Sequence, residues 1–211
     1  LYPDPVRANI SQNSFVDVNG NNSEFRALVR LLDDPDKDVY SSISEKLISF
    51  GAEAISHLET EWEGSMEPII QVRIESIIHR IQLDQCRLRL QNWVTEGGKD
   101  LLEGALIVSG FQYPDLNEDE VRQQIARIRT DIWVELNDNL TALEKVRIMN
   151  HILFGVHHFS ENTRNIQSPD NNYINTLLQS KKGNPLSLGL LYCVIAKDLG
   201  LPVVGVDLPH H

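Results

Sequence analysis

Three side chains could act as nucleophiles in this chain: Ser187, Cys193 and Cys86. A serine attacks only when a neutral histidine within hydrogen-bond reach takes its proton and an acid orients that histidine. A cysteine attacks as the thiolate, which forms most readily where a helix N-terminus or a cation lowers the thiol pKa. No acid partner is identifiable for Ser187, and both cysteines lie in apolar, helix-like surroundings. We therefore interpret both thiols as buried and structural, and Ser187 as a residue that caps its own helix.

Histidine spacing gives no support for a metal site. His151 and His158 share a helix face but lie about 10 Å apart along the axis, beyond the reach of one zinc ion. His57 and Glu61, four residues apart, are typical of a solvated pair. The sequence also lacks a glycine-rich phosphate loop and a dinucleotide-binding motif. We expect neither a metal nor another cofactor.

Ser187 belongs to the clearest helix signal of the chain, at residues 184–200. Asn184 is a good N-cap, Pro185 suits the first helical position, and Gly-Leu-Pro at 200–202 ends the helix. Almost every position between these ends is apolar, which is typical of a helix buried on all sides. The apolar run is only about 12 residues long, whereas a membrane span requires ~20. The sequence therefore predicts a central core helix.

Most other segments also predict helices, because their apolar residues recur every three or four positions. Residues 1–22 are polar and aperiodic and predict an N-terminal arm, after which Ser23 caps the first helix. Separate helices are expected at 68–81 and 86–95, and a strand at 203–206. Further helices are predicted at about 23–32, 39–50, 54–62, 100–110, 118–137, 142–156 and 173–182.

Residues 24–82 resemble HEAT repeats, in which two helices are joined by a short turn. The resemblance rests on Leu-x-x-Leu-Leu-Asp-Asp-Pro-Asp-x-x-Val at 28–39 and, loosely, on Val72-Arg73 in the next unit. It implies a concave protein-binding surface. A pair of repeats buries its own apolar faces poorly, so a role in capping the neighbouring core is an equal alternative.

The region from about Thr141 onward resembles the transglutaminase-like superfamily, and more closely the small bacterial SirB-type proteins. Three stretches carry the resemblance: Asn-Asn-Tyr-Ile at 171–174, Lys-Gly-Asn-Pro-Leu-Ser-Leu at 182–188, and 199–211 with its Leu-Gly-Leu-Pro and Pro-His-His. The resemblance implies a papain-related Cys-His-Asp site, with the cysteine at the start of the core helix and the histidine on the following strand. In this chain Pro185 occupies the expected cysteine position.

Cys193 cannot replace the missing thiol. It lies eight residues after Pro185, about 12 Å along the helix axis. The helix dipole acts only within the first turn, so Cys193 lies too far from the helix N-terminus to take the place of that cysteine.

The sequence predicts three parts: a polar arm at 1–22, HEAT-like helical pairs at 23–97, and a transglutaminase-like helical domain at 98–211. The expected fold class is mainly α. HEAT-like pairs would pack on the helical part of a transglutaminase-like, papain-related α+β domain that is truncated after its first strand.

We expect a degenerate, non-catalytic domain that binds a protein or peptide, with Asn184, Ser187, Tyr173 and His210 as candidate binding residues. The alternative is a hydrolase or protease-like enzyme in which Ser187 is the nucleophile and His211, at the Pro-x-His position of the resemblance, is its base. A third possibility is a structural scaffold in which the HEAT-like pairs supply the binding face.

Composition argues against other classes of partner. The formal net charge of -11 disfavours binding to a nucleic acid or an anionic membrane. At 41% hydrophobic and 23% charged residues, the chain is typical of a globular protein. Two helix-embedded cysteines suit a reducing compartment. The sequence thus predicts a protein of the bacterial cytoplasm.

Overall fold

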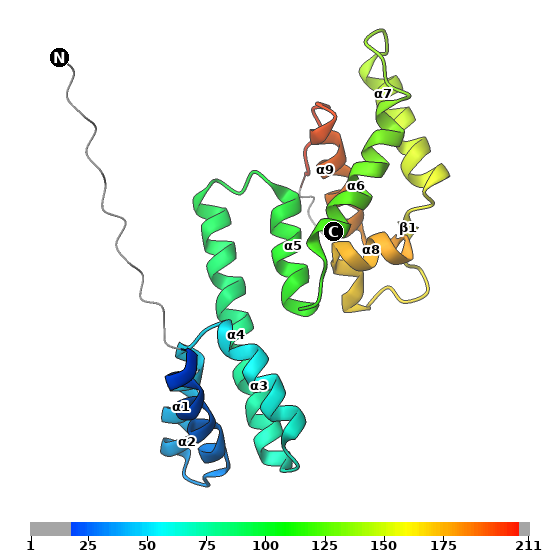
Figure 1. Cartoon of the computed structure of the whole chain (residues 1–211). Coiled ribbons are helices and arrows are strands. Elements are labelled where there is room, and N and C mark those ends of the chain that lie inside the picture. Colours follow the sequence, from blue (N-terminus) through cyan, green and yellow to red (C-terminus); the bar gives the residue numbers. More distant parts are fainter. Residues whose placement is uncertain (1–17, 207–211) are drawn as a thin grey trace, which may run out of the picture. The chain divides into compact units, whose positions relative to one another are not determined.

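The computed structural model describes residues 18–206, with side chains from residue 24 onward, and this part of the chain is mainly helical (Figure 1). The chain divides into two compact units between Gln82 and Leu83, inside a long helix. The predicted arm at 1–22 lies mostly outside the described residues. Its last residues belong to the first helix, which begins at Val18, so the prediction that Ser23 caps this helix is wrong. Residues 18–23 contain no proline, the residue that most strongly interrupts a helix.

The first unit consists of helices around one apolar core. Its described elements are α1 (Val18–Arg30), η1 (Leu31–Asp33), α2 (Lys37–Ser49), α3 (Glu53–Gly64) and the first part of α4 (Pro68–Thr95). The buried residues of this core are Phe25, Val29, Leu32, Ile43, Leu47, Ala54, Leu58, Ile74, Ile77 and Ile81.

Arg73 ties the turn between α1 and α2 to α4. Its guanidinium lies 4.4 Å from the centre of the Tyr40 ring and donates hydrogen bonds to the carbonyl oxygens of Leu32 and Asp34. This contact does not test the resemblance to HEAT repeats. The HEAT-like character of these helices stays a prediction.

Helix α4 is continuous, although the sequence predicted two helices at 68–81 and 86–95. The intervening residues 82–85 contain neither glycine nor proline, so the backbone has no reason to leave the helix there. Near its end, the Trp93 ring covers Gly104 so closely that a Cβ on Gly104 would lie 2.9 Å from the ring. A side chain at position 104 would therefore separate the following helix, α5 (Leu101–Gln112), from the end of α4.

The second unit begins with the remainder of α4 and is built mainly of helices. Its further elements are α5 (Leu101–Gln112), α6 (Glu118–Trp133), α7 (Ala142–Asn150), the π-helix η2 (His151–Val156), β1 (Ser160–Glu161), the 3₁₀-helix η3 (Pro169–Asn172), α8 (Ile174–Ser180), β2 (Lys182–Gly183) and α9 (Pro185–Asp198).

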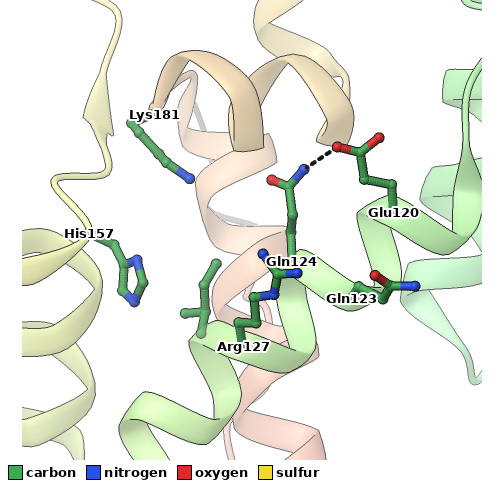
Figure 2. A pocket seen from close by; sticks show the side chains of 7 residues that line it. Glu120, Gln123, Gln124, Arg127, His157 and Lys181 are labelled. Atoms are coloured by element: carbon green, nitrogen blue, oxygen red, sulfur yellow. Dashed lines mark hydrogen bonds between the residues drawn. The ribbon is translucent and has the colours of Figure 1, made fainter.

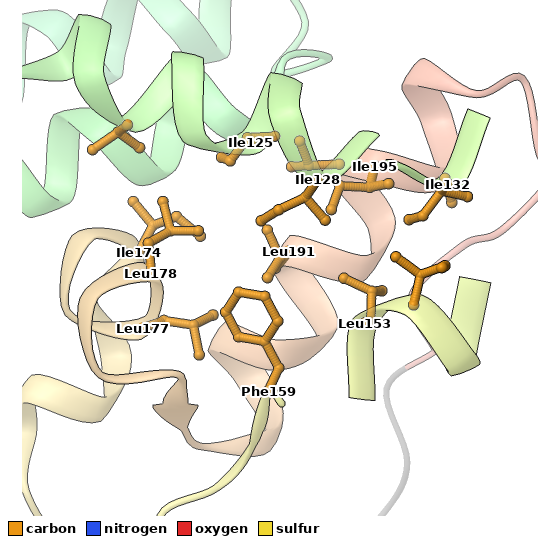
Figure 3. Close-up of a cluster of buried hydrophobic side chains, with 14 of the residues drawn as sticks. Ile125, Ile128, Ile132, Leu153, Phe159, Ile174, Leu177, Leu178, Leu191 and Ile195 are labelled. Carbon is orange, nitrogen blue, oxygen red and sulfur yellow. The ribbon is translucent and has the colours of Figure 1, made fainter. Parts of the chain in front are cut away.

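Helix α9 contributes one face to the core of this unit, where it packs against α5, α6 and α8 (Figure 3). Leu191, Val194, Ile195 and Ala196 are buried, but Leu186 is 70% exposed. The prediction of a helix buried on all sides is therefore wrong within the described residues. The sequence could not predict the exposed side of α9, because a uniformly apolar helix does not indicate which of its faces is left uncovered.

The strand content of the described chain is one short parallel pair. Ser160 and Glu161 in β1 pair with Lys182 and Gly183 in β2. Residues 203–206 form no strand, contrary to prediction, and are not part of the two-stranded sheet. The mainly α fold class is confirmed, as is a scarcity of strands. Among the described residues, no helix is both long and apolar enough to cross a membrane.

Candidate functional site

The start of α9 is closed by a reciprocal pair of hydrogen bonds. The Ser187 amide donates to Asn184 Oδ1 at 2.9 Å, and the Asn184 amide donates to Ser187 Oγ at 3.1 Å. Pro185 follows the cap at the first helical position, as the sequence predicted. Together these bonds form a capping box, which satisfies two backbone donors at the helix end.

Ser187 is buried, and its hydroxyl is engaged on both sides. It is 1% exposed, accepts from the Asn184 amide, and donates to the Asn184 carbonyl oxygen at 3.3 Å. A Cβ on Gly183 would collide with Ser187 Oγ and lie 2.8 Å from Leu177 Cδ1. The hydroxyl is therefore enclosed by its own helix start and by β2, and it performs the capping role expected from the sequence.

Asparagine side chains hold the preceding loop against the start of α9. Asn184 Nδ2 donates to Asn172 Oδ1 at 2.6 Å. Asn171, which is buried, accepts from Asn162 Nδ2 at 2.9 Å and donates to the Asn165 carbonyl oxygen at 2.8 Å. The side chain of Asn184 is thus committed to the cap and to Asn172.

Tyr173, the third candidate binding residue, packs at the start of α8. Its ring meets that of Tyr113 edge to face, with centroids 5.3 Å apart. The Tyr113 hydroxyl donates to Asp170 Oδ1 at 2.9 Å. Burial, reinforced by this hydrogen bond, raises the pKa of Tyr113 to about 12. Tyr173 therefore helps to fix the loop that carries Asp170 and the asparagines.

The two cysteines are free thiols and are only partly buried, so the prediction that both are buried is wrong. Cys193 is spaced four residues from both Gly189 and Lys197, which are exposed, and so lies on the same outer side of α9 as these residues. Cys86 lies on α4, with its sulfur 3.9 Å from the Ile107 carbonyl oxygen. Cys193 is more than two turns from the helix start, too far for the dipole to promote its thiolate.

His211, the predicted base for Ser187, lies outside the described residues. His210 and His211 both follow residue 206, so neither can be placed beside Ser187 or Asn184. The structure brings together Asn184, Ser187 and the loop before Tyr173, while the Ser187–His211 pair stays a prediction.

A second polar site, which the sequence did not predict, lies on one side of α6 (Figure 2). It is a pocket of about 290 Å³ lined by Glu120, Gln123, Gln124, Arg127, Ile128, His157 and Lys181. The four polar positions on α6 are spaced i, i+3, i+4 and i+7, which places them on one helix face. That spacing was readable from the sequence, but the approach of His157 and Lys181 depends on the fold.

No group of three or more histidine, cysteine, aspartate or glutamate side chains suited to a metal ion occurs within the described residues. His157 instead pairs with a carboxylate of α6: its Nε2 lies 2.9 Å from Asp131 Oδ2. This contact fixes the end of η2 against α6.

Comparison with known proteins identifies the class of this domain. Residues 119–211 match the model of the transglutaminase-like superfamily. This segment contains α6 to α9 and the capped start of α9, so the chain carries a transglutaminase-like domain.

Individual relatives are bacterial and animal proteins. A UPF0162 protein of Xylella fastidiosa is 30% identical over 115 residues, which are 53% of this chain and 40% of the relative. A UPF0162 protein of Pasteurella multocida is 28% identical over 89 residues, 42% of this chain and 34% of the relative. The human F-box only protein 21 is 35% identical over 63 residues, 30% of this chain and 10% of the relative. No solved structure is significantly similar. The chain spans about two fifths or less of each of these relatives.

Proposed function

We propose that the transglutaminase-like domain of this chain is non-catalytic and binds a protein or peptide. The observation that carries the proposal is the absence of an available nucleophile at the start of α9 among the described residues. Pro185 stands at the position where the resemblance places a cysteine, and the hydroxyl of Ser187 is buried in its own cap. Cys193 lacks the helix-end environment that generates a thiolate.

The exposed side of α9 supports a binding role. Pro185, Leu186 and Gly189 are exposed on it, and Tyr192 stacks with the partly exposed Phe154, with ring centroids 6.5 Å apart. The exposed apolar residues lie toward the start of this side, and the exposed Lys197 lies near its end. An exposed apolar surface on a helix is the kind of surface that protein partners cover. The partner proposed here is therefore a peptide segment or protein with an apolar contact surface.

The non-catalytic half of the proposal is tested by alkylation of the native protein with iodoacetamide. We expect Cys193 to react no faster than an unperturbed thiol, and more slowly than after unfolding in denaturant, because it is partly covered and lies more than two turns from the N-terminus of α9. Mass spectrometry locates the label, and Cys193→Ser supplies the background. Native labelling of Cys193 that is faster than labelling of the unfolded chain would show an activated thiol and refute a non-catalytic domain.

The binding half is tested by selecting peptides from a random display library on the native protein. Leu186 is the second residue of α9, and Leu143, 60% exposed, is the second residue of α7, so the two leucines are matched by position. Selected peptides should lose binding to Leu186→Lys and keep it with Leu143→Lys. Failure to select any peptide, or equal binding to both variants, would contradict the proposed face.

The enzyme alternative, a hydrolase using Ser187 and His211, has the buried Ser187 hydroxyl against it. We further infer that the helical pairs of the first unit are HEAT-like, that the second unit is of the SirB type, and that the chain works in the bacterial cytoplasm. The two free cysteines support a reducing compartment. The net charge of -11 supports partners other than nucleic acids and anionic membranes.

A further inference from the structure

The pocket beside α6 collects positive charge in a strongly acidic protein. Figure 2 shows Lys181 and His157 toward one end of it, Arg127 in the middle and Glu120 toward the other end. The three basic residues come from the end of η2, the end of α8 and the middle of α6. The fold therefore brings them together from positions up to 54 residues apart in the sequence.

Lys181 is held in place by the backbone and by a ring. It ends α8 in the left-handed conformation, with φ 60°, and its Nζ lies 4.7 Å from the centre of the Phe159 ring. Burial lowers the pKa of this amine, which shows that it is partly shielded from water. No ion pair is described for Lys181 or for Arg127 within residues 24–206.

The charged side chains that line the pocket are the two cations Arg127 and Lys181 and one carboxylate, Glu120. Asp131 does not line the pocket and is engaged by His157. Glu120 accepts a hydrogen bond from Gln124 Nε2 at 3.4 Å and opposes only one of the two charges on Arg127 and Lys181. Among the lining side chains the cations thus outnumber the carboxylates, which favours an anionic ligand. It must also be small, because the volume is about 290 Å³.

We propose that the pocket lined by Arg127, Lys181 and His157 binds a carboxylate group. The planar fork of the Arg127 guanidinium matches the two oxygens of a carboxylate, and the Lys181 amine supplies a second cation from the opposite wall. A small free carboxylate and the C-terminal carboxylate of a peptide share this chemistry. The site is independent of the chemistry at the start of α9.

The test follows backbone amide shifts of the native chain by NMR during titration with sodium acetate, with acetamide as the uncharged match. Acetate should cause saturable shifts near residues 127, 157 and 181, and acetamide should not. Arg127→Gln and Lys181→Gln should each weaken acetate binding by about tenfold, because each removes one charge-assisted hydrogen bond. Arg129→Gln, which makes the same charge change two residues further along α6 at a position that does not line the pocket, should have no effect.

A second comparison distinguishes a small free carboxylate from the C-terminal carboxylate of a peptide. It uses acetylated trialanine with a free C-terminal carboxylate and the same peptide with an amidated C-terminus. Binding about tenfold tighter than acetate would assign the site to a peptide C-terminus, and equal binding would assign it to a free small carboxylate. Equal shifts with acetate and acetamide, or unchanged acetate binding in both pocket variants with circular dichroism confirming their folding, would overturn the proposal. Tighter binding of inorganic phosphate than of acetate would overturn the choice of carboxylate.

Discussion

The close approach of Gly183 and Ser187 determines how the start of α9 is enclosed. Position 183 accepts no side chain, because a Cβ would meet Ser187 Oγ and Leu177 together. Gly183 also pairs with Glu161 in the short sheet. The residue thus lets β2, α8 and the cap of α9 converge on one buried hydroxyl.

Gly183→Ala should destabilise the protein by about 1–3 kcal/mol, the usual cost of overpacking a filled site. Gly189→Ala is the matched control, since an added Cβ there meets nothing within 4 Å. Within a helix that change should stabilise by about 0.5–1 kcal/mol. Urea unfolding of both variants measures the difference, and a neutral or stabilising Gly183→Ala would show that Ser187 has room to move.

Tyr113 should make stability fall at alkaline pH. Its pKa is raised from 10.0 to about 12 by burial and by the hydrogen bond to Asp170. The neutral phenol is therefore favoured in the folded chain, so its contribution is fully present below pH 10 and is lost as the pH rises toward 12. Urea unfolding between pH 8 and 11 should show a smaller decline for Tyr113→Phe than for the parent chain. Identical declines would refute the raised pKa.

Helix caps illustrate what the sequence predicts well. The Asn184 cap was predicted correctly, because a capping residue and its partners lie within one turn of chain. The sequence did not predict three other features: the continuity of α4, the exposed side of α9 and the absence of a strand at 203–206. Each depends on which distant segments supply a covering or pairing surface. The pocket beside α6 was missed for the same reason, since Lys181 reaches it only through the fold.

Asn184 should contribute more to the stability of α9 than its capping role alone, because its side-chain amide also donates a hydrogen bond to Asn172 Oδ1. Asn184→Ala removes both contacts and should cost about 1 kcal/mol for the cap, with a further loss for the bond to Asn172. Asn184→Asp keeps the cap acceptor and places a negative charge at the helix start, where it is favourable. Urea unfolding should therefore show that Asn184→Asp is more stable than Asn184→Ala. Equal losses would mean that the cap contributes nothing.

At the scale of the whole molecule, the described chain has two separate apolar cores. One gathers residues between Phe25 and Ile81, and the other gathers residues between Leu106 and Ala196. The two clusters share no side chain, although α4 runs through the division between the units. Each core is therefore expected to determine the stability of its own helices.

Leu47→Ala and Ile195→Ala test this separation, because both residues are 0% exposed and lie in different cores. Each should destabilise its own unit by about 2–5 kcal/mol, the usual cost of such a cavity. Hydrogen exchange should show faster exchange in α2 and α3 for Leu47→Ala and in α6 and α9 for Ile195→Ala. Uniform acceleration throughout the chain in both variants would indicate a single cooperative unit.

The central claim is that the start of α9 is a closed structural cap without a working nucleophile. The most direct measurement is treatment of the native chain with a fluorophosphonate probe, followed by mass spectrometry of the peptide that contains Ser187. Ser187→Ala, with folding verified by circular dichroism, provides the background. The account predicts no modification of Ser187 above that background. Stoichiometric labelling of Ser187 in the native protein, lost in Ser187→Ala, would contradict it and establish the serine hydrolase.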